Sequence, residues 1–179
     1  MDSINENQSE LNHLDLHGND AVKKIKDLIK TAKSCFFCTS SSASMSDGVR
    51  PMSVQEVDDQ GNCWFLSASD SYKNQQLQLD PSTRLYFQGS AHSGFLSLSG
   101  TAEVSTDKAK IKELWEPIVK TWFTEGEDDP RITVIKFIPR DGYYWDNKHG
   151  DIVAGAKMLA GALVGRTLDD SIEGRLNFS

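Results

Sequence analysis

The feature that most constrains this chain is a series of short strand-like runs joined by turns. The run "GFLSLSGTAEV" at 94–104 alternates serine with leucine, so its two faces should meet different surroundings. "DDQG" at 58–61 separates two other runs and predicts a hairpin. Because turns of this length cannot hold crossover helices, the runs predict a mainly antiparallel sheet. They lie at 35–40, 49–57, 62–68, 84–89, 94–104, 131–139 and 141–147.

Four further segments have helical character. Residues 20–33 gather their apolar side chains on one helical face, and residues 70–79 form a short helix. Residues 106–123 are amphipathic, with Trp122 in the apolar stripe, and Pro117 should kink or split this helix. Residues 151–165 are apolar and rich in small side chains, which predicts a closing helix.

The fold class that follows is mainly β (α+β): a small antiparallel β-barrel with peripheral helices. Strands do not alternate with helices as in a βαβ repeat. No G-x-G-x-x-G follows a strand and no Walker loop is present, so the common nucleotide-binding folds are poorly supported.

Composition excludes several classes of partner. The 179 residues carry a net charge of -7, which argues against nucleic acid because phosphate backbones require a concentrated basic surface. No apolar run approaches the roughly 20 residues that span a bilayer, and the first 19 residues lack a secretory signal. We therefore expect a cytoplasmic protein with a disordered polar tail at 1–19, one domain at 20–165 and a polar C-terminal tail at 166–179.

The three cysteines do not suggest a metal site. Cys35 and Cys38 form a C-x-x-C inside a strand-like run, where positions three apart face opposite sides. No second C-x-x-C follows, so a structural zinc site would lack ligands. Buried free thiols in a reducing cytosol are expected, and no metal is predicted.

The stretch "SASDSYKNQQLQLDP" at 67–81 raises a question of charge. A strand ends near Ser67, a short helix begins near Asp70, and Lys73 falls in its first turn, where a cation opposes the helix dipole. A bound anion would reverse that penalty, because a helix start offers unpaired N–H groups and Lys73 adds a full charge. Arg50 could add a second cation. The alternative is a solvated lysine on a surface helix.

Several motifs in the sequence resemble those of a known family. "RPMSV", "WFLSASDSYK" and "LQLDP" are similar to the flavin-binding split barrels, the pyridoxamine 5'-phosphate oxidase-like proteins. "SLSGTAEV", "ELWEPIVKTWFTEGEDDPRITVIKFIP" and "GYYWD" resemble the bacterial general stress protein subgroup, and the resemblance covers roughly residues 20–165. It implies a six-stranded antiparallel split β-barrel and a homodimer that binds flavin mononucleotide (FMN), or alternatively FAD, at the subunit interface.

The resemblance also implies roles for particular residues. Those that would lie along the flavin ring and ribityl chain are Arg50, Pro51, Met52 and Ser53, with Leu66 and Ser67 on the next strand. Those that would hold the phosphate are Ser71, Tyr72 and Lys73. Trp145 would lie near the flavin edge, and in one arrangement the partner chain would supply it. Phe95 stands where the oxidases place a glutamine near the flavin.

The sequence departs from the oxidases that act on pyridoxamine phosphate. Their arginine-rich C-terminal segment is replaced by "GRTLDDSIEGRLNFS", and Tyr72 stands where they carry a second cation. We therefore expect a flavin-dependent oxidoreductase with a small-molecule redox substrate other than pyridoxamine phosphate. Two alternatives stay open: a non-catalytic flavin-binding or flavin-buffering stress protein, and a split barrel that uses deazaflavin or haem. Haem would need an axial ligand, for which His92 and His149 are the candidates.

Overall fold

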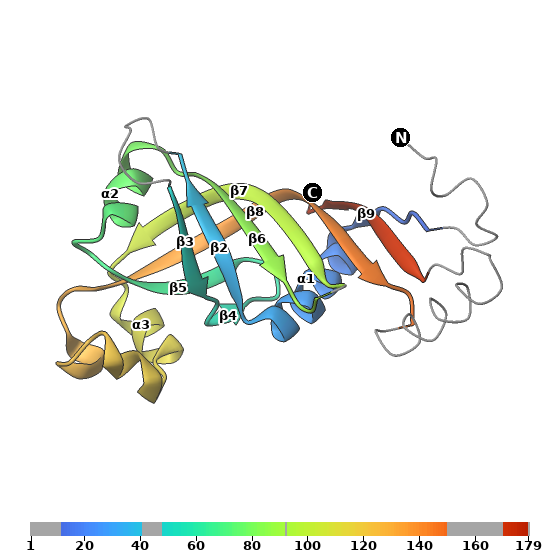
Figure 1. Cartoon of the computed structure of the whole chain (residues 1–179). Helices are drawn as coiled ribbons and strands as arrows, with labels where there is room; N and C mark the ends of the chain where they lie inside the picture. Colours follow the sequence, from blue (N-terminus) through green and yellow to red (C-terminus); the bar gives the residue numbers. More distant parts are fainter. Residues whose placement is uncertain (1–11, 41–47, 92, 150–169, 179) are drawn as a thin grey trace.

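The computed structural model describes residues 12–40, 48–91, 93–149 and 170–178, which form one nine-stranded sheet with helices around it (Figure 1). The strands are β1 (Leu16–His17), β2 (Ser34–Thr39), β3 (Val49–Ser53), β4 (Glu56–Val57), β5 (Cys63–Ala68), β6 (Ser82–Gln88), β7 (Phe95–Ser105), β8 (Ile132–Asn147) and β9 (Ser171–Asn177). The helices are α1 (Gly18–Ala32), α2 (Tyr72–Leu79), α3 (Lys108–Leu114), η1 (Pro117–Thr121) and η2 (Gly126–Asp128), the last two being 3₁₀ turns.

Six of the strands form the predicted split barrel. They pair antiparallel in the order β3-β2-β6-β7-β8-β5, and β3 and β5, at the two ends of this order, do not pair with each other. The barrel is therefore open along one line. The predicted split barrel is confirmed, but the sheet has nine strands instead of six, because β9 and the two-residue strands β1 and β4 are added to it.

The barrel interior is a packed apolar core. Successive residues of β2 and β6 alternate between buried and exposed, as expected for strands with one face against a core. Phe37 of β2 meets Phe65 of β5 edge to face, with ring centroids 5.3 Å apart. Helix α1 buries Ala21, Ile25 and Ile29 in the same core, which confirms its predicted amphipathic face.

Strand β8 replaces two predicted strands with one continuous strand of 16 residues. Its first half pairs with β5 and its second half with β9, while β7 pairs along both. A register shift between Ser99 and Gly100 lets β7 follow this bent strand. A Cβ at Gly100 would collide with the carbonyl oxygen of Ile138, so only glycine fits the bulge.

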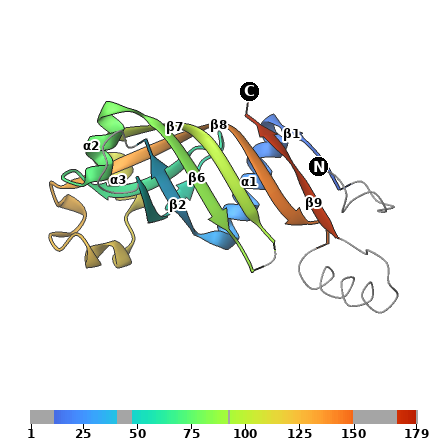
Figure 2. The same cartoon turned by 45° about the horizontal axis from the view of Figure 1, so that its top comes forward.

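Two segments expected to be polar tails contribute strands. β9 pairs with β8, and the short β1 pairs parallel with β9, extending the sheet beyond the barrel at the end away from α2 (Figures 1 and 2). Leu176 of β9 is buried in the core. The buried and exposed positions of β9 alternate over too few residues for the strand to be evident in the sequence. The closing helix predicted at 151–165 lies outside the described residues.

A second apolar cluster lies on the outer side of β5 and β8. Ile111 and Leu114 of α3 and Val119 of η1 pack there against Ile132 and Val134 of β8. As predicted, Pro117 splits the helix: α3 ends at Leu114 and η1 begins at Pro117. This cluster fixes the 3₁₀ turns beside the open line of the barrel.

Candidate cofactor site

A cavity of about 630 Å³ lies where the barrel is open. Strand β3 supplies one wall, β5 and the start of α2 supply another, and the residues that follow η1 close the third side. Its lining residues are Ser34, Pro51, Met52, Ser53, Gln55, Leu66, Ser67, Ala68, Ser71, Lys73, Val119, Trp122 and Phe123. Seven of the residues predicted to bind a cofactor are therefore brought together on this one cavity.

Lys73 is the strongest electrostatic feature of the cavity. Its side chain lines the cavity although the residue is only 7% exposed, and no carboxylate pairs with it among the described residues. Burial, followed by repulsion from Arg50, lowers the pKa of Lys73 from 10.5 to about 8. A buried cation without a counter-ion is costly, so this position favours an anion from outside the chain.

Arg50 is held beside Lys73 by neutral partners. Its Nη2 donates to Oε1 of Gln76 at 2.8 Å and its Nη1 to Oγ1 of Thr39 at 3.4 Å. The hydroxyl of Thr39 also donates to Oε1 of Gln76 at 2.6 Å, which fixes the amide that orients the guanidinium. No carboxylate within the described parts of the chain pairs with Arg50, so its charge adds to that of Lys73.

Gln76 was missed by the sequence analysis. It stands three residues after Lys73 in α2, a spacing that places both side chains on one face of the helix. That spacing was a usable signal, although nothing else in the sequence separated Gln76 from the two neighbouring glutamines, Gln75 and Gln78. Arg50 itself does not line the cavity wall, so its predicted place along a flavin ring stays a prediction.

The two serines have different roles. Ser71 is the N-cap of α2, and its Oγ accepts from the backbone N–H of Asn74 at 3.3 Å. Ser67 donates to Oδ1 of Asn74 at 3.0 Å, and Nδ2 of Asn74 donates to Oγ1 of Thr133 at 2.8 Å. Since that network occupies the only hydrogen of the Ser67 hydroxyl, Ser67 joins β5, α2 and β8. The hydroxyl of Ser71 lies 3.3 Å from that of Ser67 and can donate either to it or to a ligand in the cavity.

The apolar walls come from both predicted and unpredicted residues. Met52 and Leu66 are half-buried on β3 and β5, where they can cover a flat ring. Val119, Trp122 and Phe123 were not predicted as site residues. Trp122 was expected inside an amphipathic helix, but it is 66% exposed, because the chain after Pro117 forms a 3₁₀ turn and loses the helical period.

Besides Arg50, three predicted site residues do not line the cavity of this chain. Tyr72 does not line it and is 76% exposed. Phe95 and Trp145 lie directly opposite each other on β7 and β8, at the end of the sheet away from α2 (Figure 1). Trp145 packs on Tyr143 at 4.6 Å between ring centroids. Within one chain, these residues do not complete the site.

The described thiols and histidines form no redox or metal centre. The three cysteines are free, and burial raises the pKa of Cys35 to about 12, so this thiol stays protonated. Nδ1 of His149 lies 2.6 Å from Oδ1 of the buried Asp170, and His92 lies outside the described residues. In the described parts of the chain, no group of histidine, cysteine and acidic residues could hold a metal ion. No helix there is long and apolar enough to cross a membrane.

Comparison with known proteins identifies the family to which this chain belongs. A family model described as pyridoxamine 5'-phosphate oxidase like matches residues 20–169. Among curated proteins, protein bli-3 of Neurospora crassa is 26% identical over 110 residues, which cover 57% of this chain and 53% of that protein. The chain therefore matches about half the length of this curated relative.

Solved structures share the fold. A candidate general stress protein 26 from Jannaschia sp. CCS1 is 22% identical with a TM-score of 0.74, covering 88% of this chain and 98% of that one. The general stress FMN/FAD binding protein from Xanthomonas citri is 24% identical with a TM-score of 0.58, covering 66% of this chain and 83% of that one. At these identities, the two structures show the fold alone.

Proposed function

Because this chain belongs to the pyridoxamine 5'-phosphate oxidase-like family, we propose that it binds FMN in the cavity at the barrel opening and acts as a flavin-dependent oxidoreductase of the general stress protein type. The observation that carries the proposal is Lys73, a buried ammonium group without a carboxylate partner among the described residues. An anionic cofactor would supply the missing partner.

The lining residues fit the parts of a flavin. Lys73, Arg50 and the hydroxyl of Ser71 converge near the start of α2, where free backbone N–H groups also favour a phosphate. Met52 and Leu66 offer apolar contact to a ring, and the exposed backbone of β3 faces the opening, where it can meet polar ring edges. Bound flavin would supply the redox chemistry, while these residues hold it and limit the access of water. FAD is the alternative cofactor.

A homodimer would account for the predicted residues that lie outside the cavity. Phe36 and Tyr86 are cross-strand neighbours on the outer face of β2 and β6, where they are 58% and 41% exposed. Pro51, which lines the cavity from β3, pairs with Phe36 in the same row. We therefore place the dimer contact on this face, with Phe95 and Trp145 of one chain approaching the cavity of the other. A cytoplasmic location is part of the same proposal.

One observation favours the non-catalytic alternative. Among the residues that the structure describes, the cavity lining contains no histidine, aspartate or glutamate, so Lys73 is the only titratable side chain of this described lining that could exchange a proton near neutral pH. A protein that stores or buffers flavin needs no such group. The haem alternative has less support, because His149 is hydrogen-bonded to Asp170 and does not line the cavity.

The test is a visible absorption spectrum of the purified protein, with mass identification of whatever dissociates on denaturation. Flavin bands and FMN in one-to-one ratio with the chain are expected. Turnover of a reduced nicotinamide with a quinone or dye acceptor, faster than with free flavin, then separates oxidoreductase from flavin storage. A protein that neither contains nor binds FMN or FAD would refute the proposal.

A further inference from the structure

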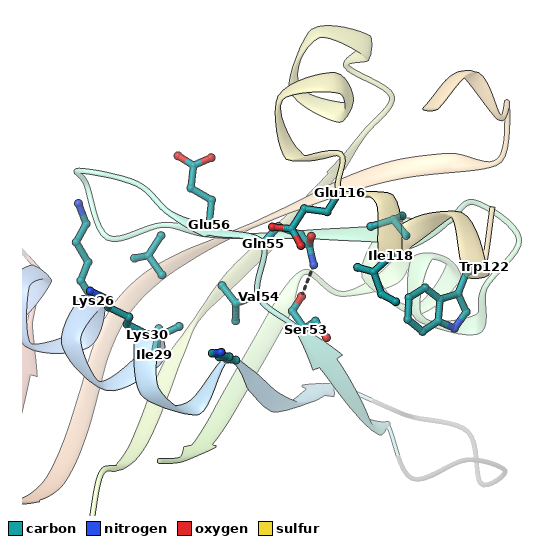
Figure 3. A pocket seen from close by; sticks show the side chains of 13 residues that line it. Lys26, Ile29, Lys30, Ser53, Val54, Gln55, Glu56, Glu116, Ile118 and Trp122 are labelled. Atoms are coloured by element: carbon teal, nitrogen blue, oxygen red, sulfur yellow. Dashed lines mark hydrogen bonds between the residues drawn. The ribbon is translucent and has the colours of Figure 1, made fainter. Parts of the chain in front are cut away.

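A second hollow of about 660 Å³ lies beside the cofactor cavity (Figure 3). Helix α1 forms one side, the link from β3 to β4 forms the floor, and the chain around η1 forms the other side. We call it the lysine groove; its lining residues are Lys26, Ile29, Lys30, Lys33, Ser53, Val54, Gln55, Glu56, Val57, Glu116, Ile118, Val119 and Trp122.

The lysine groove adjoins the cofactor cavity. Ser53, Gln55, Val119 and Trp122 line both hollows, whereas Lys73 lines the cavity alone. Trp122 therefore belongs to both walls, and a molecule in the groove would contact residues that also line the cavity but would not contact Lys73. This is where a second reactant could approach a bound flavin.

The charges of the groove are unevenly distributed. Lys26 pairs with Asp59 at 2.7 Å, and Glu56 pairs with Lys110 at 2.6 Å, so these charges are largely compensated. Lys30 and Lys33 have no carboxylate partner among the described residues. The α1 side of the groove therefore keeps two uncompensated positive charges that can attract an anion.

The η1 side of the groove is apolar except for the exposed carboxylate of Glu116, which precedes Pro117. Ile118 and Trp122 are 62% and 66% exposed, and Figure 3 shows both on the η1 side, across the groove from Lys26 and Lys30 of α1. Val54 lies on the floor between the two sides (Figure 3). An apolar wall facing a cationic wall matches a ligand with an apolar body and an anionic end.

We infer that the lysine groove is the substrate subsite, and that its ligand is a small organic anion: a flat or aliphatic body against Trp122 and Ile118, with a carboxylate or phosphate at Lys30 and Lys33. The inference rests on the proposed flavin site. A ligand in the groove can react with the flavin only because the two hollows share lining residues. Lys30 and Lys33 also suit the end of α1 by the helix dipole, a role that affects stability but not ligand affinity.

The test uses two dyes of nearly equal shape. 8-Anilinonaphthalene-1-sulfonate is an aromatic anion, and N-phenyl-1-naphthylamine is its uncharged counterpart. In FMN-loaded protein, the double change Lys30→Gln and Lys33→Gln should weaken the sulfonate about five- to tenfold, the scale of two exposed charge contacts, and leave the neutral dye unchanged. Trp122→Ala should weaken both dyes. Lys23→Gln, an exposed lysine of α1 outside the groove, is the matched control.

The outcomes separate this inference from the proposed function. Equal sulfonate affinity in the double variant and the Lys23→Gln control would overturn the subsite, even if FMN binding persisted. Unchanged FMN affinity in the double variant is expected, since neither lysine lines the cofactor cavity. If the native protein bound no flavin, the proposed function would fail first, and the reactant role of the groove with it. A groove closed by a second copy of the chain would make sulfonate affinity fall with protein concentration, which would also overturn the subsite.

Discussion

Replacing Lys73 by methionine should make the flavin-free protein more stable and the flavin complex weaker. Methionine keeps a long flexible side chain but removes the charge that burial penalises. A pKa lowered from 10.5 to about 8 corresponds to at most about 3 kcal/mol of destabilisation while the amine is charged in both states. We therefore expect Lys73→Met to raise the free energy of unfolding by about 1 to 3 kcal/mol at pH 7.

The gain should disappear as the pH rises. Because the folded pKa of Lys73 lies below the unfolded value, the unfolded chain binds more protons between pH 8 and 10.5. The stability of the unsubstituted protein therefore increases across this window relative to the variant, in which position 73 does not titrate. Urea unfolding of both flavin-free proteins at pH 7 and pH 10 measures the difference, and groups common to both proteins cancel.

FMN titration of the same variant should show the opposite effect. Losing one charged hydrogen bond to phosphate costs about 1.5 to 3 kcal/mol, or about 10- to 150-fold in Kd. Lys108→Met is the matched control, since Lys108 also lies in the first turn of a helix but is exposed. A Lys73→Met protein that is less stable than the original at pH 7, or that binds FMN equally well, would refute the reasoning.

Three further changes probe the site and its frame. Gln76→Leu should leave Arg50 without its best acceptor and weaken FMN by about 1 kcal/mol, measured by titration; unchanged affinity would remove Gln76 as a positioning residue. Ser71→Ala should cost about 1 kcal/mol of unfolding free energy through loss of the α2 cap, visible in urea unfolding, whereas Ser71→Asp should preserve the cap but repel FMN. Gly174→Ala places a Cβ against the carbonyl of Leu14, which should push the segment around residue 14 away from β9. Limited proteolysis should then cleave near residue 14 faster; an unchanged cleavage rate would show that the backbone accommodates the Cβ without detaching.

The local elements of this protein were predictable because each depends on residues close together in the chain. The face of α1, the hairpin at 58–61 and the break at Pro117 all follow from periodicity or from backbone restrictions of single residues. The unfavourable position of Lys73 in a helix was also visible, since the sign of a charge and its place in the first turn are properties of the sequence.

The boundaries of the sheet were less predictable. β9 and β1 carry so few apolar residues that their sequences resemble tails, and only pairing with β8 gives their backbone groups partners. Likewise, nothing local separates Gln76 from its neighbouring glutamines until the chain brings Arg50 and Thr39 to it from β3 and β2.

By itself, the sequence determined most of the barrel strands, which face of α1 is apolar, and that a lysine begins a short helix after a strand. Only the tertiary structure decided that β3 and β5 do not pair with each other, that Lys73 is buried at this opening, and that Trp122 lines both hollows. Periodicity records which side of an element avoids water, whereas burial and charge pairing depend on residues distant in the chain, whose contacts form only when the barrel folds.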